Sequence, residues 1–359
     1  MSNKNISFLE GFVLPFVALI GSLVVFGLFV FVSGQSPVEA WKLLFLGAFG
    51  DAFSIQNTLQ RAAPLMLTAL CVAIPANAGL TVIGGEGSLL VGALACSAVP
   101  YFWSVPLNTQ GTCILMMASC IGGACWMSLV GVMRQYRGVN ETISSLLLAY
   151  LAVNVFKHLV EGPMRDPGSL NKPSTFALSP ELLIGGIAGY DVHWGLVWGL
   201  VFCLLASLWL KFTSHGFATK VVGGNPRAAS FVGLPTNALI VTACALGGAA
   251  AGLAGGFEIA AIHTASNASV IAGLGYTGIL VSFAARHKPM LIVPVAIVLG
   301  GFGSAGSLLQ RRLGLPDASI QVLMGFAFIF ILAAESARGR IQWSRIWRSK
   351  LDPNALGAR

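Results

Sequence analysis

Residues 237–257 read Asn-Ala-Leu-Ile-Val-Thr-Ala-Cys-Ala-Leu-Gly-Gly-Ala-Ala-Ala-Gly-Leu-Ala-Gly-Gly-Phe, a stretch without a charged side chain. About 20 mostly apolar residues in an α-helix cross the hydrocarbon core of a bilayer, which is roughly 30 Å thick. Small residues recur here every four positions, at Gly248, Gly252 and Gly256, and such a flank lets a neighbouring membrane helix approach closely. The stretch therefore predicts a membrane-spanning helix that packs tightly against other helices.

Similar apolar runs recur along the whole chain. Of its 359 residues 56% are hydrophobic and 9% are charged, whereas roughly 25% are charged in an ordinary soluble domain. The polar breaks between the runs delimit ten predicted spans: 12–33, 58–79, 88–104, 111–133, 142–160, 194–212, 237–257, 265–285, 289–305 and 318–336. We therefore expect an all-α integral membrane protein with about 10 transmembrane helices, in which residues 1–336 form the transmembrane domain.

The basic residues predict the orientation of these spans. With a cytoplasmic N-terminus, fourteen of the 21 basic residues fall inside: Lys4, Arg134, Arg137, Lys211, Lys220, Arg227, Arg286, Lys288, Arg338, Arg340, Arg345, Arg348, Lys350 and Arg359. Six fall outside, and Arg61 lies near a membrane face: Lys42, Lys157, Arg165, Lys172, Arg311 and Arg312. This excess satisfies the positive-inside rule, so both termini are expected in the cytoplasm. Residues 337–359 are interpreted as a basic cytoplasmic tail that anchors the topology, in preference to a nucleic-acid-binding arm.

Three connecting segments are long enough to carry function. Residues 34–57 and 161–193 are expected outside and residues 213–236 inside. In the inner loop, Asn225 can cap a helix, Pro226 suits its first turn, and Gly233 followed by Pro235 stops it after about two turns. This helix either merely links two spans or offers a rigid grip to a motor subunit, and we favour the second interpretation.

No pattern of an enzyme is present in the sequence. The dipeptide Gly-Lys of a phosphate-binding loop does not occur, the five histidines are scattered singly, and the seven cysteines lack metal-ligand spacing. We therefore expect no intrinsic enzymatic activity and no bound metal. Glu86, in a glycine-rich break at 83–88, either faces protein or a water-filled path or is a solvated carboxylate at the inner mouth. Glu258 and Glu335 lie at span ends, where snorkelling or pairing is expected.

A set of short strings, in this order and spacing, resembles the permeases of bacterial ABC importers for branched-chain amino acids, simple sugars and nucleosides. The resemblance covers residues 36–335 and rests on these strings: Gly47-Ala-Phe-Gly50, Pro64-Leu-Met-Leu-Thr-Ala-Leu70, Ile83-Gly-Gly-Glu-Gly87, Gly92-Ala-Leu94, Gly138-Val-Asn-Glu-Thr-Ile-Ser144, Gly162-Pro-Met-Arg-Asp-Pro167, Gly223-Gly-Asn-Pro-Arg-Ala-Ala229, Gly252-Leu-Ala-Gly255 and Gly278-Ile-Leu-Val-Ser282. The Gly-Glu-Gly break and the Asn-Glu-Thr-Ile-Ser segment look most like the nucleoside and simple-sugar branch. In this chain Val82, Ser88 and Ala149 replace amide side chains usual in that branch.

This resemblance implies a type II importer-like permease in the bacterial cytoplasmic (inner) membrane. It implies a cytoplasmic ATPase that hydrolyses ATP, a periplasmic or lipoprotein substrate-binding protein, and a second permease subunit, either a different chain or a second copy. The chain itself would bind no cofactor and no nucleic acid. The coupling segment to the ATPase would comprise Gly223, Gly224, Asn225, Pro226, Arg227, Ala228 and Ala229, and the binding protein would dock at Arg165, Asp166 and Lys172.

Polar and aromatic residues near the span breaks are the candidates for the substrate path. They are Asn77, Glu86, Ser88, Asn154 and Phe283, because a nucleoside needs one aromatic face and partners for its ribose. Each of them could instead make an ordinary hydrogen bond between helices. Two other classes remain as alternatives to a nucleoside or sugar permease: a branched-chain amino-acid permease and an ion-coupled secondary transporter. A membrane scaffold that moves nothing would leave the capped inner helix unexplained.

Overall fold

The computed structural model describes residues 3–187, 189–316 and 318–337. The basic tail predicted at 337–359 lies almost entirely outside these residues. The helices in chain order are α1 (Asn3–Val32), α2 (Pro37–Phe49), α3 (Ala52–Asn77), α4 (Gly85–Phe102), α5 (Thr109–Arg137), α6 (Glu141–Glu161), α7 (Gly195–Phe212), α8 (Ser214–Gly224), α9 (Pro226–Phe231), α10 (Thr236–Phe257), α11 (Leu274–Ala284), α12 (Pro289–Leu313) and α13 (Ala318–Ala337). Short 3-10 turns occur at Pro180–Leu182 and Ala268–Val270, and a π-helix, η2, occurs at Glu258–His263.

Each of the ten predicted spans overlaps a helix. Within the described residues, seven helices are long and apolar enough to cross a membrane, namely α3, α5, α6, α7, α10 together with η2, α12 and α13. The apolar parts of α1 (Val17–Val32) and of the segment Ala268–Ala284 are shorter. The outer segment expected at 34–57 is not a plain loop, because α2 forms within it.

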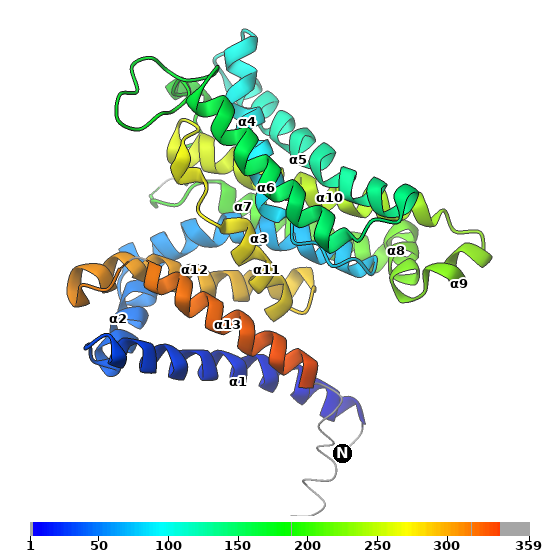
Figure 1. Cartoon of the computed structure of the whole chain (residues 1–359), viewed down its shortest axis with the longest axis horizontal. Helices are drawn as coiled ribbons and strands as arrows, with labels where there is room; N and C mark the ends of the chain where they lie inside the picture. The colour runs from blue at the N-terminus through cyan, green and yellow to red at the C-terminus, as the bar shows by residue number, and fades with distance from the viewer. Residues whose placement is uncertain (1–2, 188, 317, 338–359) are drawn as a thin grey trace, which may run out of the picture. The chain divides into compact units, whose positions relative to one another are not determined.

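The chain divides into two compact units, residues 1–37 with 321–359 and residues 38–320. In the larger unit α10 is the central helix and packs against α3, α4 and α5 (Figure 1). A Cβ atom added to Gly252 would overlap the carbonyl oxygen of Ser119 on α5, and one added to Gly255 would overlap that of Leu89 on α4. The small-residue flank predicted from the sequence is therefore the surface on which neighbouring helices make backbone contact.

In the smaller unit α1 and α13 lie against each other (Figure 1). The ring of Phe330 lies over Gly21, where a Cβ atom would come within 2.8 Å of it. Phe26 and Val30 on the same helix are fully buried. A glycine facing an aromatic ring lets these two helices approach closely.

The segment between α6 and α7 is extended and ordered by backbone hydrogen bonds. The amide of Thr175 donates to the carbonyl of Ser266 at 3.0 Å, that of Leu178 to Thr264 at 2.8 Å, and that of Ile184 to Ala260 at 2.8 Å. These bonds satisfy backbone groups that a helix would otherwise satisfy internally. The segment is therefore fixed along the stretch that joins α10 to α11.

Candidate functional site

The predicted inner helix is present as α9. The side chain of Asn225 accepts a hydrogen bond from the amide of Ala228 at 3.1 Å, Pro226 occupies the first turn, and Gly233 follows the helix with a φ of 82°. These are the cap, start and stop that the sequence predicted. Phe231, the last residue of α9, and Val232, which follows it, are 89% and 75% exposed.

The residues before α9 connect it to the end of α3. A Cβ atom on Gly223 would overlap the carbonyl oxygen of Asn77 and lie 2.9 Å from the amide of Gly79. Only a glycine allows the two backbones to come this close. The end of α8, which leads directly into α9, therefore abuts the end of a long apolar helix. Of the seven residues predicted for coupling, Ala229 is buried, Gly223 is half-buried and the rest are exposed.

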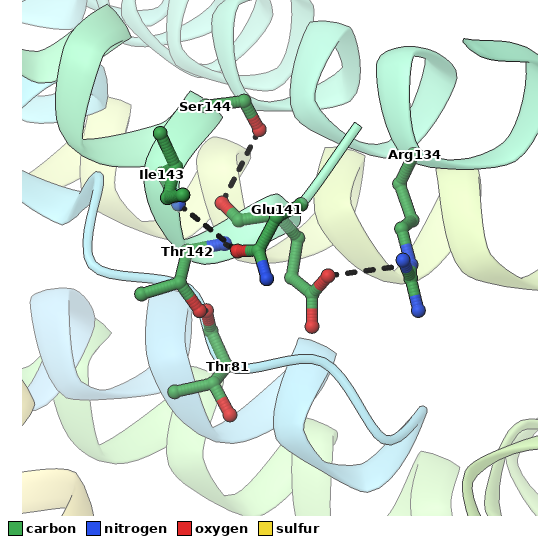
Figure 2. Close-up of polar contacts among 7 residues, drawn as sticks. Thr81, Arg134, Glu141, Thr142, Ile143 and Ser144 are labelled. Atoms are coloured by element: carbon green, nitrogen blue, oxygen red, sulfur yellow. Dashed lines mark hydrogen bonds and ion pairs between the residues drawn. The ribbon is translucent and has the colours of Figure 1, made fainter. Parts of the chain in front are cut away.

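Of the glycine-rich break predicted at 83–88, residues 83 and 84 end the connection between α3 and α4, and residues 85–88 form the first turn of α4. In this connection Leu80 and Val82 are buried, and the amide of Ile83 donates to the hydroxyl of Ser145 on α6 at 3.0 Å. The hydroxyl of Thr142 donates to the carbonyl of Thr81 at 2.8 Å (Figure 2). The start of α6 therefore satisfies backbone groups of the connection between α3 and α4.

The start of α6 is itself held by polar contacts. Asn140 caps the helix, because its side chain accepts from the amides of Thr142 and Ile143 at 2.9 and 3.2 Å. Glu141 pairs with Arg134 of α5, and the distance between Oε2 and Nε is 3.2 Å (Figure 2). The Asn-Glu-Thr-Ile-Ser segment thus caps a helix, pairs a charge and binds the connection between α3 and α4.

Glu86 is fully enclosed and binds the beginning of another helix. One carboxylate oxygen accepts from the amide of Gly273 at 3.0 Å and the other from the amide of Gly275 at 2.6 Å. A helix start exposes unpaired amides and favours a negative charge, so the carboxylate caps α11, whose own cap residue is a glycine. Of the two interpretations of Glu86, the protein-facing one is correct, since its side chain is 1% exposed.

This contact requires very close packing of the two helix starts. A Cβ atom on Gly275 would overlap the backbone of Glu86, so the first turns of α4 and α11 touch through glycine. Ser88, one turn into α4, is fully buried, and its hydroxyl lacks a hydrogen-bond partner among the described residues. Two of the five candidates for the substrate path therefore lie together, in the first turns of α4.

The other three candidates lie on different helices. The side-chain amide of Asn77, at the end of α3, donates to the carbonyls of Ala73 at 2.7 Å and His287 at 3.2 Å. Asn154 is exposed on α6 and donates to Tyr150 one turn earlier at 2.8 Å. Phe283 on α11 meets the ring of His287 edge-on, with centroids 4.8 Å apart. Asn77 thus connects the end of α3 to the loop before α12, whereas the hydrogen bond of Asn154 lies within α6 and does not join two helices.

The three residues predicted to dock a binding protein lie in the extended segment between α6 and α7. Arg165 donates to the carbonyl of Ser169 at 3.0 Å, and Asp166 accepts from the amide of Gly168 at 2.8 Å. Lys172 donates to the hydroxyl of Ser269 at 3.2 Å, which connects this segment to the approach to α11. Arg165 and Lys172 are exposed.

A cavity of about 430 Å³ lies beside the same segment. Its walls come from the end of α4, from residues 103–107 and from residues 175–182, and they include Tyr101, Trp103 and Phe176. The rings of Tyr101 and Phe176 are nearly parallel, with centroids 6.4 Å apart. None of the sequence-predicted site residues lines this cavity.

The sequence analysis expected snorkelling or pairing for Glu258 at the end of α10, but it did not identify the partner. Glu258 is 6% exposed and lies 3.5 Å from the ring of His263, which confirms pairing rather than snorkelling. His193 is also buried, and burial lowers its pKa. The pair Glu258 and His263 is five residues apart, a spacing that does not bring side chains together in an α-helix, so helical periodicity could not find it.

The long apolar helices, and α9 with its predicted cap, start and stop, are the features expected of a membrane transport permease. Residues 54–332 match the family model described as branched-chain amino acid transport system / permease component, so the chain belongs to this family. It is accordingly a permease subunit of an ABC importer in the inner membrane and not an enzyme. Such subunits associate with an ATPase and a substrate-binding protein.

Three characterised relatives align over most of the chain. A glucose ABC transporter permease of Haloferax volcanii is 29% identical and the alignment covers 89% of this chain and 87% of the relative. A guanosine ABC transporter permease of Bacillus subtilis is 26% identical, with 92% and 95% covered. A nucleoside ABC transporter permease of Lactococcus lactis is 25% identical, with 93% of each covered. The sequence-based family assignment is therefore confirmed.

Proposed function

We propose that this chain translocates a nucleoside or a simple sugar that a binding protein delivers to the outer face. The similarity to glucose, guanosine and nucleoside permeases along nearly the whole chain supports this substrate class over branched-chain amino acids. An ion-coupled secondary transporter would need ionisable residues along its path. The family membership argues against that alternative.

The observation that carries the mechanism is α9 with its exposed apolar end. Phe231 and Val232 offer a hydrophobic contact to a cytoplasmic ATPase, and Asn225 and Pro226 keep the helix rigid enough to transmit force. Because Gly223 abuts the end of α3, a displacement of α9 would reach a membrane helix directly. ATP hydrolysis by the partner would displace α9 and thereby change the side of the membrane to which the substrate path is open.

The arrangement in the membrane follows the distribution of basic residues. We place about ten spans in the membrane, both termini and the coupling segment 213–236 in the cytoplasm, and the segment 161–193 outside. Arg165, Asp166 and Lys172 would then meet the binding protein, and a second permease subunit, different or identical, would complete the path. Along that path we retain the five candidates Asn77, Glu86, Ser88, Asn154 and Phe283.

Uptake by the complete transporter tests the substrate class. The chain, its ATPase, its partner permease and its binding protein are expressed together in cells that lack their own uptake systems, and radiolabelled guanosine, glucose and leucine are supplied separately. We expect ATP-dependent uptake of guanosine or glucose and none of leucine. Uptake of leucine alone would replace this proposal with the amino-acid alternative, and uptake that persists with an inactive ATPase would support a secondary transporter.

A further inference from the structure

The cavity at the end of α4 has no part in the mechanism proposed for α9, and we call it the α4 cavity. Its volume of about 430 Å³ lies within the range of roughly 300–1,000 Å³ that is usual for small-molecule sites. Such sites combine apolar and aromatic walls with a few polar groups. The α4 cavity has aromatic rings and hydroxyl groups in its lining: Tyr101, Trp103, Phe176, Ser97, Thr175 and Ser179.

The aromatic wall of the α4 cavity is held in place by direct contacts. The hydroxyl of Tyr101 donates to the carbonyl of Pro163 at 2.9 Å, and the ring of Phe102 meets that of Tyr101 edge-on, with centroids 4.9 Å apart. The ring of Phe176 is inclined by 26° to that of Tyr101. Tyr101 and Phe176 are nevertheless 43% and 52% exposed, so their faces are available to a ligand. A large aromatic surface in a fixed orientation suits the apolar face of a ring.

Buried hydroxyl groups form another part of the lining. Ser97 and Thr175 are 4% and 3% exposed, and Ser266 holds both of them. The hydroxyl oxygens of Ser97 and Ser266 are 2.7 Å apart, and the hydroxyl oxygen of Thr175 accepts from the amide of Ser266 at 3.0 Å. The proton of the Thr175 hydroxyl points to the carbonyl of Phe176 at 3.4 Å, which is longer than the roughly 2.5–3.0 Å of an ordinary O–H···O hydrogen bond. A ligand oxygen could therefore accept a stronger hydrogen bond from Thr175.

Hydrogen bonds connect the α4 cavity to the residues predicted to dock a binding protein. Pro163, which accepts from Tyr101 in the cavity wall, lies just before Arg165 in the chain. The amide of Asp166 donates to the carbonyl of Ser174 at 2.8 Å, and the cavity wall begins at the next residue. α4 then leads from the cavity back to its own first turn, which carries two candidates for the substrate path. The cavity therefore lies between the predicted docking residues and that path.

We propose that the α4 cavity is an entry site, which binds the transported molecule after the binding protein releases it. This inference rests on the proposed function, because nucleosides and simple sugars both combine an apolar ring face with hydroxyl groups. The ring face packs on Tyr101 and Phe176, and the hydroxyl groups form hydrogen bonds with Ser97 and Thr175. A lipid chain or an apolar side chain of the binding protein fits this lining less well, because it would cover the hydroxyl groups without forming hydrogen bonds with them.

Protection of an introduced cysteine from labelling tests this assignment. The seven native cysteines are replaced, Ala177→Cys is introduced in the cavity wall, and the purified transporter is placed in nanodiscs without its binding protein. The probe is whichever of guanosine and glucose the intact transporter takes up. We expect a saturating probe to slow the reaction of Ala177→Cys with a maleimide several-fold, and leucine to leave the rate unchanged. Leu170→Cys, 82% exposed in the same segment and outside the cavity lining, is the control and should react at one rate throughout.

Variants of the aromatic wall test whether the ring of Phe176 contributes to binding. In the Ala177→Cys background, Phe176→Ala should raise the probe concentration that gives half-maximal protection about tenfold, because an aromatic contact and its buried area are lost. Phe176→Tyr keeps the ring and should restore protection at the original concentration. Phe45→Ala removes a ring that is 66% exposed on α2, outside the cavity lining, and should protect like the parent protein.

Two results would overturn the entry site and leave the proposed function standing. One is an unchanged labelling rate of Ala177→Cys at the highest probe concentration that dissolves, while the intact transporter takes up the same probe. The other is protection by the ligand-free binding protein and not by the probe, which would show that the cavity receives a protein side chain. Failure of the intact transporter to take up either guanosine or glucose would instead contradict the proposed function, and the entry site with it.

Discussion

Glu86 shows how a single residue can decide the geometry of a membrane site. Its sequence context, a carboxylate among glycines, left two interpretations open, because periodicity gives no information about the partner of a side chain. The partner is a pair of amides on α11, almost 190 residues later in the chain. The glycines at 84–87 and Gly275 were visible in the sequence, but their close approach depends on how α4 and α11 cross.

Replacement of Glu86 by glutamine should destabilise the protein. The glutamine can still accept from Gly275 through its oxygen, but its NH₂ group would face the amide of Gly273 and leave a buried donor without an acceptor. We expect a loss of about 1–3 kcal/mol in the free energy of unfolding. Thermal unfolding of the purified complex measures it, with the exposed Glu181→Gln as the control. Equal unfolding temperatures for wild type and Glu86→Gln would show that the cap contributes nothing.

A buried and a half-buried histidine should make stability depend on pH. Burial lowers the pKa of His193 and of His287, which lie in loops that precede α7 and α12. The unfolded chain, whose histidines have a pKa of about 6.5, therefore takes up protons before the folded chain does as the pH falls. Stability should be unaffected by these groups above about pH 6.5 and should fall below it.

Chemical denaturation at a series of pH values between 8 and 5.5, as a rough range around that pKa, measures this dependence. The double variant His193→Gln, His287→Gln removes both titrating groups, so its stability should change less with pH than that of wild type. The same slope in wild type and in the double variant would contradict the assignment.

At the scale of the element, α9 was predictable in detail because its signals are local. Asn225, Pro226 and Gly233 act through neighbours within a few residues, and each occupies the role that its chemistry favours. The π-helix η2 was not predictable, since nothing local distinguishes it from the end of α10. The extended segment between α6 and α7 was assigned as a loop, and its backbone pairing with residues 260–266 depends on tertiary contacts.

Loss of the α9 cap should uncouple the transporter. Asn225→Ala removes the hydrogen bond to the amide of Ala228 and should cost about 1 kcal/mol of helix stability, enough to disorder a six-residue helix. We expect substrate-stimulated ATP hydrolysis and uptake to fall several-fold, and Asn225→Asp to retain them. Both activities are measured in proteoliposomes with the complete transporter.

The control for this prediction is a cap elsewhere in the chain. Asn108 caps α5 in the same way, by accepting from the amides of Gln110 and Gly111 at 3.0 and 3.2 Å. Asn108→Ala should lower stability by a similar amount and leave ATP hydrolysis coupled to transport. Equal uncoupling by both variants would show that cap loss acts through general stability, and α9 would lose its assigned role.

At the scale of the whole molecule, composition alone was enough to assign the class. An apolar content of 56% and the excess of basic residues on one side predicted a multispanning membrane protein, and the family match agrees. The number of spans is harder to predict. Seven described helices satisfy both length and apolar content, whereas α4 carries the charged Glu86 in its first turn and α11 has eleven residues. A helix that is short, or that begins with a polar residue, lies in a bilayer only where other parts of the protein surround it. A count of apolar residues along the sequence does not show such surroundings.

Cysteine labelling in intact cells tests the proposed orientation. In a background with the seven native cysteines replaced, Leu170→Cys, 82% exposed in the outer segment, should react with a membrane-impermeant maleimide added outside. Ser230→Cys on α9 should react only after the membrane is permeabilised. The reverse pattern would invert the topology and remove α9 from contact with any cytoplasmic ATPase.

The hydrogen bonds between residues 175–184 and 260–266 also limit where the outer segment can change in length. An insertion between Thr175 and Leu178 would shift the backbone groups of this segment away from their hydrogen-bond partners in residues 260–266. Gly189, with a φ of 86° and open space around it, lies beyond these hydrogen bonds. A short epitope inserted after Gly189 should therefore leave the transporter intact. That turn is a natural place for a tag with which the protein could be followed on living cells.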